Sequence, residues 1–458
     1  MKSRLNSPAA RDTSSHLHAF TNAKTHLEHG PLIIERGDGV YVEDSQGNRY
    51  IEGMAGLWSV ALGFSEQRLA DAAVRQMRQL PFYHSFSHRS HGPLIDLAEK
   101  LVEMVPVPMS KAFFTNSGSE ANDSALKFIW YRANAMGTPE KKKIIARDRG
   151  YHGVTVASAS LTGLPTSHRS FNLPIAGILH TSCPHHWRNA NTDESEEMFS
   201  TRLADELETL ILAEGPETIA AFFAEPVMGA GGVIVPPATY WEKIQTVLRK
   251  YDVLLVADEV ICGFGRTGRM FGCQTFGIEP DIMVLSKQLS SSYQPIAALL
   301  INDKVFEPIA EESNKIGVLG HGFTCGGHPV AAAVALENIA IIEERDLVEN
   351  AQKMGARMQA GLAEFSDHPL VGEVRGVGLI AAVELTHDKS ASTPPEPTGA
   401  LGSAMNGITL ANGLVSRNMI DTMALCPPLI ISENEVDQIV QIMGASLDQL
   451  QRSLSDKI

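Results

Sequence analysis

Between about residues 65 and 330, short continuous apolar runs alternate with longer amphipathic segments. Continuous apolar runs are typical of parallel strands that helices cover on both faces, because such strands have no face in water. Their alternation with helices predicts right-handed βαβ units in one open sheet. The strands that we expect cover residues 112–114, 144–146, 219–224, 253–257 and 282–285.

The two ends of the chain have a different pattern. Residues 1–30 are polar and predict a helical or irregular arm, and short β segments with turn residues over 31–51 predict a small antiparallel meander. Ser432 and Glu435 fit a capping box at the start of a C-terminal helix. The other segments expected after Pro329 are a long helical stretch through the 330s to the 360s, a strand over 378–385, a loop over 386–403 and a strand over 422–425.

Composition and charge exclude several classes of protein. The 458 residues include 38 Lys and Arg against 53 Asp and Glu, a net charge of −15. This balance argues against a general nucleic-acid binder and against docking on anionic membranes. No apolar run reaches the roughly 18–20 residues of a membrane span, and no secretory signal is evident. The five cysteines are odd in number and scattered, so we expect a reducing, cytoplasmic location and not a disulfide framework.

Polar residues follow the expected strands at their carboxyl ends, where open parallel sheets bind ligands. The first strand is followed by a Gly-Ser turn and a helix start at Ser117, Gly118 and Ser119. Free backbone N–H groups make such a junction suitable for an anion, although an ordinary capped helix is the alternative. Glu120 can complete a capping box with Ser117.

Two charged residues, Asp258 and Lys287, end buried strands. A buried carboxylate is costly unless it is paired, so Asp258 predicts either a structural salt bridge or a ligand with a protonated ring nitrogen. Burial lowers the pKa of a lysine amine and makes it nucleophilic, which Schiff-base chemistry requires. The alternative for Lys287 is a side chain that extends to the surface.

Two other motifs are weaker. The run Gly263–Gly268 matches GxGxxG, but two acidic residues precede it and no convincing helix follows, which disfavours a dinucleotide-binding oxidoreductase. The pairs His16/His18 and His185/His186 lack carboxylate or cysteine companions at ligand spacing along the chain. We therefore interpret both pairs as surface histidines and expect no metal site.

Five motifs resemble, in order and spacing, those of the class III aminotransferases, fold-type-I enzymes that depend on pyridoxal 5′-phosphate (PLP). They are the runs 116–122, 151–153, 258–260, 286–287 and 322–324. The resemblance extends from about residue 20 to 450. It implies an α/β fold with a mostly parallel central sheet between helices and a smaller α+β domain built from both termini. The expected parts are an arm and small-domain segment (1–64), a large PLP-binding domain (65–330) and a C-terminal small domain (331–458).

The resemblance also implies residue roles. Lys287 would hold PLP through a Schiff base and move the proton, and Asp258 would pair with the ring nitrogen. Tyr151 and Val260 would cover the two ring faces, while Thr324 would reach the phosphate from the second subunit of a dimer. The full expected cofactor-binding set is Ser117, Gly118, Ser119, Tyr151, His152, Glu225, Asp258, Val260, Lys287, Phe323 and Thr324.

Further residues resemble the ω-transaminase branch, which includes the amine:pyruvate and β-alanine:pyruvate enzymes. Arg417 matches a mobile arginine that grips the carboxylate of the substrate. The expected substrate-contacting residues are Phe20, Leu57, Trp58, Phe86, Tyr151, Ala230 and Arg417, with core packing as the alternative for the apolar ones.

The implied reaction moves an amino group from a primary amine or ω-amino acid to a 2-oxo acid, in a homodimer with shared active sites or a tetramer. A single candidate arginine favours pyruvate as the acceptor. The alternatives are an enzyme of the 4-aminobutyrate type that uses 2-oxoglutarate, or another PLP reaction on the same scaffold. Cys325 stands where the branch often has another residue, close to the expected phosphate site.

Overall fold

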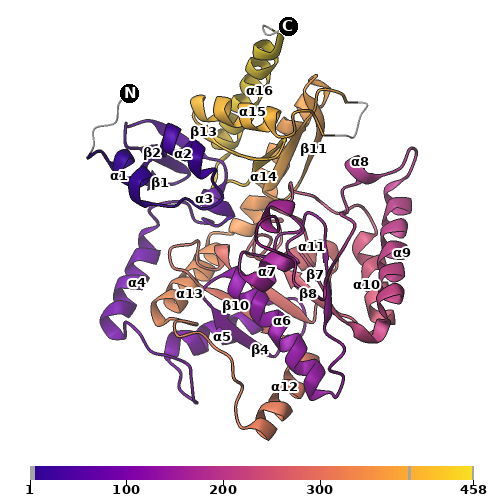
Figure 1. Ribbon diagram of the computed structural model, residues 1–458. Coiled ribbons are helices and arrows are strands. Elements are labelled where there is room, and N and C mark those ends of the chain that lie inside the picture. The colour runs from indigo at the N-terminus through magenta and orange to yellow at the C-terminus, as the bar shows by residue number, and fades with distance from the viewer. Residues whose placement is uncertain (1–5, 390–393, 456–458) are drawn as a thin grey trace.

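The centre of the molecule is a seven-stranded sheet in a computed structural model that describes residues 6–389 and 394–455 (Figure 1). The strand order is β4-β10-β9-β8-β7-β5-β6. The strands are β4 (Lys111–Thr115), β5 (Lys143–Arg147), β6 (Ile178–Thr181), β7 (Ile219–Ala224), β8 (Leu254–Asp258), β9 (Ile282–Leu285) and β10 (Ala297–Ile301). All five strands expected from the apolar runs are present, and β6 and β10 were not foreseen.

The sheet is parallel except at β10, which pairs antiparallel with both β9 and β4. The connection from β9 to β10, residues 286–296, holds one 3₁₀ helix (Lys287–Leu289) and no α-helix, whereas a parallel crossover usually runs through an α-helix. The prediction of a mostly parallel α/β sheet is therefore confirmed, with one reversal that the apolar runs do not reveal.

Helices cover both faces of this sheet, as the continuous apolar strands require. Successive residues of a strand point to opposite faces, so Phe222 joins the hydrophobic cluster on one side and Phe223 joins the cluster on the other. Ile145 and Ile144 divide in the same way. The surrounding helices are α4 (Gln67–Gln79), α5 (Gly92–Met104), α6 (Gly118–Ala135), α7 (Val156–Leu161), α9 (Glu196–Glu214), α10 (Tyr240–Lys250), α11 (Gly272–Phe276), α12 (Asp303–Ile316) and α13 (Pro329–Glu344).

Two small sheets combine early and late parts of the chain. The expected meander forms from β1 (Ile34–Asp38), β2 (Tyr41–Asp44) and β3 (Arg49–Glu52), and β13 (Leu414–Val415) adds to it in parallel with β3. The other sheet has the order β11-β12-β15-β14, with β11 (Val371–Val377), β12 (Ile380–Leu385), β15 (Thr422–Leu425) and β14 (Arg417–Met419). The first described helix and the C-terminal helix both lie toward the end of the molecule that carries these sheets (Figure 1).

Most of the remaining helices belong to the N-terminal arm and to the C-terminal part of the chain. They are α1 (Pro8–Ser15), α2 (Ala23–His29), α3 (Ala55–Trp58), α8 (His186–Asn189), α14 (Leu347–Ala363), α15 (Ala400–Ala411) and α16 (Glu433–Ser455). The long helical stretch expected after Pro329 is confirmed, and it consists of two helices, because α13 and α14 are separated at Asp346, whose φ of 51° is left-handed. Part of the loop expected over 386–403 lies outside the described residues, and its last residues begin α15.

The C-terminal helix begins with a capping arrangement close to the expected one. The backbone N–H of Ser432 and its hydroxyl each lie 2.8 Å from the same carboxylate oxygen of Glu435.

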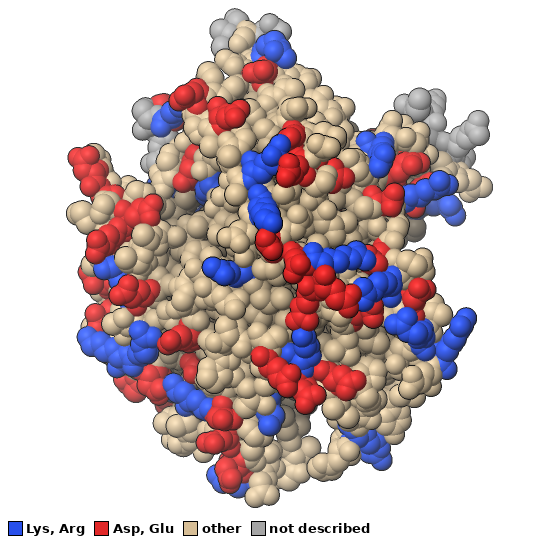
Figure 2. Space-filling model, turned by 180° about the vertical axis from the view of Figure 1, so that it is seen from behind, with Lys and Arg blue, Asp and Glu red and all other residues tan. Residues whose placement is uncertain are grey.

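Among the described residues, no helix is long and apolar enough to cross a membrane. On the face seen in Figure 2, acidic and basic side chains are interspersed.

Candidate active site

A cavity of about 150 Å³ lies at the carboxyl ends of β5, β7, β8 and β9, next to the start of α6. This is the position at which an open parallel sheet binds its ligand. The cavity brings together residues from five separate places in the sequence. Its lining consists of Gly118, Ser119, Asn122, Tyr151, His152, Gly153, Glu225, Asp258, Val260, Ile261, Ser286 and Lys287.

Asp258 ends β8 and is only 3% exposed. Its Oδ2 accepts a hydrogen bond from Nδ2 of Asn122 at 2.9 Å and lies 2.8 Å from Nδ1 of His152. Its Oδ1 accepts from the backbone N–H of Val260 at 3.1 Å. Among the described residues, neither a lysine nor an arginine forms an ion pair with this carboxylate. The side chain is therefore oriented firmly while its charge remains available to a ligand.

Asn122 is a site residue that the sequence analysis missed. It lies one turn into α6, and its Nδ2 also donates to the backbone carbonyl of His152 at 2.8 Å. Its Oδ1 is buried without a hydrogen-bond partner among the described residues. The available signal was its i, i+4 spacing from Gly118, which puts both residues on one face of the helix.

Lys287 lies two residues after the end of β9 and begins a short 3₁₀ helix (Lys287–Leu289). Its φ of 46° is left-handed, which a residue with a Cβ seldom adopts. Burial lowers the pKa of its amine, and the charges of Asp258 and Glu225 oppose that shift. A lower pKa raises the fraction of the amine that is neutral and nucleophilic near pH 7.

Glu225 fixes the backbone on two sides of the cavity. Its Oε1 accepts from the N–H of Tyr151 at 3.0 Å, and its Oε2 accepts from the N–H of Gly229 at 2.9 Å. Burial raises the pKa of this carboxyl group. Burial also raises the pKa of the Tyr151 phenol, while the Arg417 guanidinium opposes that shift.

The start of α6 forms a narrow cradle at the cavity. Oγ of Ser117 accepts from the N–H of Glu120 at 3.3 Å, but the Glu120 carboxylate returns to the N–H of Asn116 at 2.7 Å. The Glu120 side chain therefore accepts from the N–H of Asn116, one residue before the Ser117 N–H that the expected capping box would use. A Cβ on Gly153 would lie 2.4 Å from Oγ of Ser119, so only glycine fits there. The first turn of a helix leaves backbone N–H groups without intrahelical partners, and these can hold a phosphate.

Two of the expected substrate residues, Phe20 and Arg417, interact with Tyr151, which lines the cavity. Phe20 is 68% exposed, and its ring centroid lies 6.4 Å from that of Tyr151 in an edge-on arrangement. Arg417, in β14, is half-buried, and burial lowers the pKa of its guanidinium while Tyr151 opposes this. Leu57 is 57% exposed, whereas Trp58 is 2% exposed and packs in a hydrophobic cluster that includes Ile261.

Three expected site residues lie elsewhere in their own chain. Phe86 and Phe323 line a separate groove of about 1350 Å³, and Thr324 is exposed beside it. A Cβ on Gly322 would lie 2.9 Å from Cζ of Phe86, so the two segments are in direct contact. The structure therefore groups these residues with one another and not with Lys287.

The GxGxxG run has a structural role. Arg266 is fully buried and donates to the backbone carbonyls of Leu379 and Pro427 at 2.8 and 2.7 Å. The carboxylate of Glu259 accepts from the first N–H groups of α11, those of Gly272 and Cys273. A pyrophosphate would need those same groups, so the expectation against dinucleotide binding has a physical basis.

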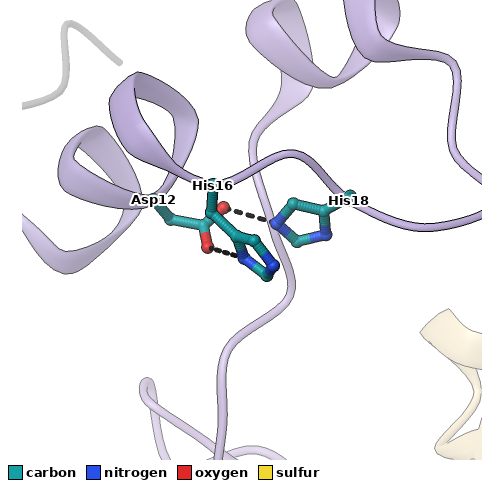
Figure 3. A group of neighbouring side chains, drawn as sticks. All are labelled: Asp12, His16 and His18. Atoms are coloured by element: carbon teal, nitrogen blue, oxygen red, sulfur yellow. Dashed lines mark hydrogen bonds and ion pairs between the residues drawn. The ribbon is translucent and has the colours of Figure 1, made fainter.

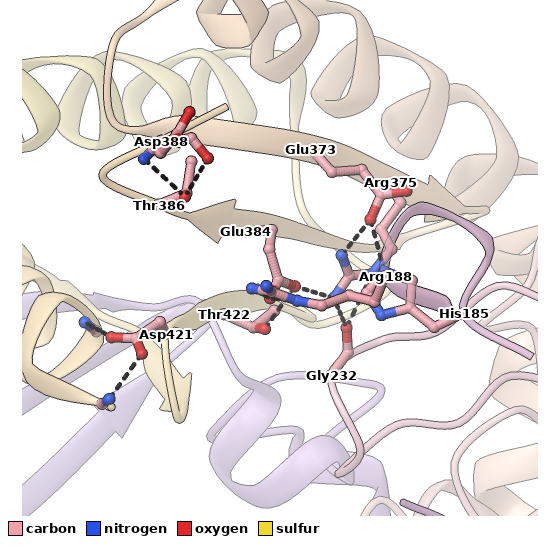
Figure 4. Close-up of polar contacts among 12 residues, drawn as sticks. His185, Arg188, Gly232, Glu373, Arg375, Glu384, Thr386, Asp388, Asp421 and Thr422 are labelled. Atoms are coloured by element: carbon pink, nitrogen blue, oxygen red, sulfur yellow. Dashed lines mark hydrogen bonds and ion pairs between the residues drawn. The ribbon is translucent and has the colours of Figure 1, made fainter. Parts of the chain in front are cut away.

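The interpretation of His185 as a surface residue was wrong, whereas His16 is exposed as expected, and folding brings a carboxylate to each histidine pair. His185 is 2% exposed, and its Nε2 lies 2.8 Å from the carboxylate of Glu373, which is 188 positions away in the chain. Glu384 lies beside them and pairs with Arg188 and Arg375, whose two guanidinium groups fill the cluster (Figure 4). Folding likewise places His16 and His18 around Asp12.

Comparison with known proteins agrees with this geometry. The model of the class-III aminotransferase family matches residues 22–447. A gamma aminobutyrate transaminase 1 (mitochondrial) of Solanum lycopersicum is 51% identical over 438 residues, which are 95% of this chain and 85% of that protein. The vanillin aminotransferase of Capsicum chinense is 49% identical over 427 residues, which are 93% of each chain.

Solved structures of omega transaminases are also similar. That of Pseudomonas jessenii in complex with PMP is 64% identical, covers 98% of this chain and 99% of its own, and has a TM-score of 0.97. A thermostable W58M/F86L/R417L variant engineered for the asymmetric synthesis of enantiopure bulky amines is 64% identical, with coverage of 97% and 99% and a TM-score of 0.97.

Proposed function

The chain belongs to the class-III aminotransferases, and we propose that it transfers an amino group from a primary amine or ω-amino acid to a 2-oxo acid, with pyruvate as the favoured acceptor. The cofactor of this family is PLP. One observation carries the proposal: Asp258, Lys287 and the start of α6 line a single cavity. These are the groups that a protonated ring nitrogen, an aldehyde and a phosphate require.

The cavity fits PLP group by group. Asp258 is a buried carboxylate without a lysine or arginine partner among the described residues, so a pyridinium nitrogen would supply the missing cation. The N–H groups at the start of α6, with Ser119, would bind the phosphate. Lys287 offers an amine with a lowered pKa at the same cavity. When bound, PLP supplies an electron sink that stabilises negative charge on the substrate carbon.

The protein residues would then do three things. Nζ of Lys287 takes the proton from the carbon that bears the amine and returns it nearby, because it is held within the same cavity. His152 and Asn122 hold the carboxylate of Asp258 in one orientation. Glu225 fixes the backbone of Tyr151, which positions the phenol ring over the cavity.

Arg417 is the residue that we assign to the substrate carboxylate. It lies near Tyr151, and no carboxylate forms an ion pair with it among the described residues. A guanidinium binds a carboxylate in a bidentate manner. One such cation suits pyruvate, which has a single carboxylate. The engineered variant with W58M/F86L/R417L supports a substrate role here, because this chain has Trp58, Phe86 and Arg417 at those numbers.

The second candidate is a 4-aminobutyrate transaminase. The tomato relative, which is 51% identical, carries that name. Because 4-aminobutyrate also has a carboxylate, Arg417 could hold this donor, and the two candidates differ in substrate but not in machinery.

We also propose a homodimer in which each chain completes the cavity of the other. Phe86, Phe323 and Thr324 lie together, outside the cavity of their own chain. A second copy that brings this group to the Lys287 cavity would account for their position.

A cytoplasmic location agrees with the five free cysteines, although plant relatives have mitochondrial and chloroplastic names.

A panel of donors and acceptors tests the proposal. The purified holoenzyme is supplied with an aryl-alkyl amine or 4-aminobutyrate as the donor and with pyruvate or 2-oxoglutarate as the acceptor, and alanine and glutamate are measured. We expect alanine from both donors. Glutamate without alanine would contradict the choice of pyruvate, and absence of both products with every donor would contradict transamination.

The variant Arg417→Ala tests the carboxylate assignment in the same panel. We expect kcat/KM to fall about 10- to 100-fold for pyruvate and 4-aminobutyrate, which is the effect of losing a charged hydrogen bond. The aryl-alkyl amine should lose less in its half-reaction. Arg249→Ala, a change at an exposed position, is the matched control. Equal losses for all substrates would remove Arg417 from this role.

A further inference from the structure

The N-terminal arm holds three imidazole rings around one carboxylate. Asp12 and His16 are separated by four positions at the end of α1, which puts them on one face of the helix. Oδ1 of Asp12 lies 3.1 Å from Nδ1 of His16, and Oδ2 lies 2.7 Å from Nε2 of His18. Figure 3 shows a dashed line from each carboxylate oxygen to one of these two rings. His26, from α2, brings its Nε2 to 3.1 Å from the same Oδ2.

The rings form a compact group next to an open space. The ring centroids of His16 and His18 are 4.3 Å apart, and those of His18 and His26 are 4.0 Å apart. A cavity of about 290 Å³ is lined by all three histidines together with apolar and hydroxyl side chains of the arm. Solvent therefore has access to the group, although His26 itself is buried.

The charge of the group suits a cation. Asp12 supplies a carboxylate to the group, and His16, His18 and His26 each place one ring nitrogen 2.7 to 3.1 Å from one of its oxygens. Within the described residues, its ion-pair partners are these imidazoles, and none is a lysine or an arginine. Each neutral imidazole can present a lone pair at the nitrogen that faces the carboxylate if its proton is on the other nitrogen.

The spacing of the donor atoms is close to that of a tetrahedral metal site. Zinc binds histidine nitrogen and carboxylate oxygen at about 2.0–2.1 Å, so neighbouring ligand atoms lie about 3.3 Å apart. The two contacts of Asp12 with His16 and His18 are 3.1 and 2.7 Å, and the three ligand atoms all lie within 4.8 Å of one another. Shifts of a few tenths of an ångström to about an ångström would accommodate an ion.

We propose that Asp12, His16 and His18 bind a divalent transition-metal ion, with Zn²⁺ as the best fit, and that His26 positions the carboxylate. Two imidazoles with one carboxylate favour Zn²⁺, Co²⁺ or Ni²⁺ over Mg²⁺ and Ca²⁺, which prefer oxygen ligands. Three protein ligands leave a fourth position for water. The inference does not depend on the proposed aminotransferase reaction, because none of these residues lines the Lys287 cavity.

A metal ion at this position would also affect the segment that leads to the candidate active site. Phe20 lies between His18 and His26 in the sequence, and its ring reaches toward Tyr151. An ion held by α1 and the following turn would therefore restrict the segment that carries Phe20 to the cavity entrance.

Metal titration of the holoenzyme tests the site. Co²⁺ is added first, and its visible d–d bands are followed as a difference spectrum; Zn²⁺ is then added in competition, and bound metal per chain is measured after equilibrium dialysis. We expect one Co²⁺ per chain, bands of tetrahedral intensity and displacement by Zn²⁺. The variants His16→Ala and His18→Ala should each weaken binding at least 100-fold, whereas His26→Gln should weaken it about 10-fold, as expected for a positioning residue.

His29→Ala is the matched control, because His29 is an exposed arm histidine whose Nδ1 contacts the Thr25 carbonyl and not Asp12. Asp12→Asn keeps the size of the side chain, so it should lose metal binding with an unchanged melting temperature in the absence of metal. No saturable Co²⁺ binding, or equal affinity in His16→Ala, His18→Ala and His29→Ala, would overturn the proposal.

Discussion

Two regions of the molecule combine a buried carboxylate with a histidine, and they differ in where the opposite charge comes from. In the Asp258 cluster (Asp258, His152 and Asn122), the carboxylate contacts an amide, an imidazole and a backbone N–H. In the Glu384 cluster (His185, Arg188, Glu373, Arg375 and Glu384), two guanidinium groups surround the carboxylate (Figure 4). The Asp258 cluster borders a cavity, whereas the Glu384 cluster links β11 and β12 to α8 and its N-cap.

Whether a buried carboxylate has a cationic partner within the chain indicates whether it serves stability or function. A buried ion pair that is complete within the chain holds segments together, and removing one partner leaves an uncompensated charge. A buried carboxylate that has only hydrogen-bond donors is kept oriented but is not neutralised. A cationic ligand is then the partner that the chain itself does not supply. Each cluster should therefore respond to substitution in its own way.

The largest effect is expected at Asp258. Asp258→Asn retains the shape and the contact with His152 but removes the charge opposite the cofactor nitrogen, so transamination should fall on the order of 10³-fold, as when a preorganised electrostatic partner is lost. The apoprotein should melt at nearly the same temperature as the wild type. Steady-state rates and thermal melts measure the two quantities. Full turnover in the variant would show that Asp258 does not supply this charge.

The opposite result is expected at Glu384. Glu384→Gln removes the carboxylate that pairs with both guanidinium groups and leaves Glu373 beside Arg375, which should lower the free energy of unfolding by about 3 kcal/mol. The turnover per folded molecule should not change, because Glu384 does not line the cavity. Urea unfolding and active-site titration measure these outcomes. A loss of less than about 1 kcal/mol would mean that the cluster is relaxed by water or by side-chain movement.

The two clusters should also differ in acid. Burial opposes ionisation of Glu384, but Arg375 and Arg188 lower its pKa to about 2, below the 4.5 of a free glutamate. Such a group stabilises the fold above the unfolded-state pKa, and the contribution disappears as pH falls toward 2. Between pH 6 and pH 3, the wild type should lose about 2 kcal/mol more stability than Glu384→Gln. Parallel pH profiles of the two apoproteins would contradict this origin.

The smallest effect is expected at Asn122. Asn122→Ala removes one hydrogen bond to Oδ2 of Asp258, so kcat/KM should fall about 10-fold, which corresponds to about 1.4 kcal/mol. Asn412→Ala, at the end of α15 and bonded to Ser446, serves as the matched control and should keep full activity. If the variant lost as much activity as Asp258→Asn, then Asn122 would have a role beyond holding the carboxylate.

Much of the central fold could be predicted from the sequence because continuous apolar runs mark buried strands. β7 and β9 have the predicted bounds, and the residues that follow the strands, Asp258 and Lys287, reach the same cavity. The direction of β10 could not be predicted from its own residues, because a buried antiparallel strand has the same apolar run. The connection between β9 and β10 contains no α-helix, which is the feature that parallel crossovers usually have.

The polar clusters were harder to predict because their members are distant in sequence. His185 meets Glu373 across 188 positions, and local spacing contains no signal for that contact. Asp12 and His16 did have a local signal, the i, i+4 spacing, but it is recognised only when the carboxylate before the histidines is considered. Their contact with His26 depends on the packing of α1 against α2.

The left-handed backbone of Lys287 affects which variants would be chosen in a screen for thermostability. Glycine would occupy this conformation without the strain of a Cβ, which is worth roughly 1–2 kcal/mol. A library of variants screened only for heat resistance would therefore be drawn toward glycine at position 287, and with it toward proteins without the amine. Thermostability and chemistry compete at this one residue, so an engineering campaign should keep position 287 fixed and seek stability elsewhere.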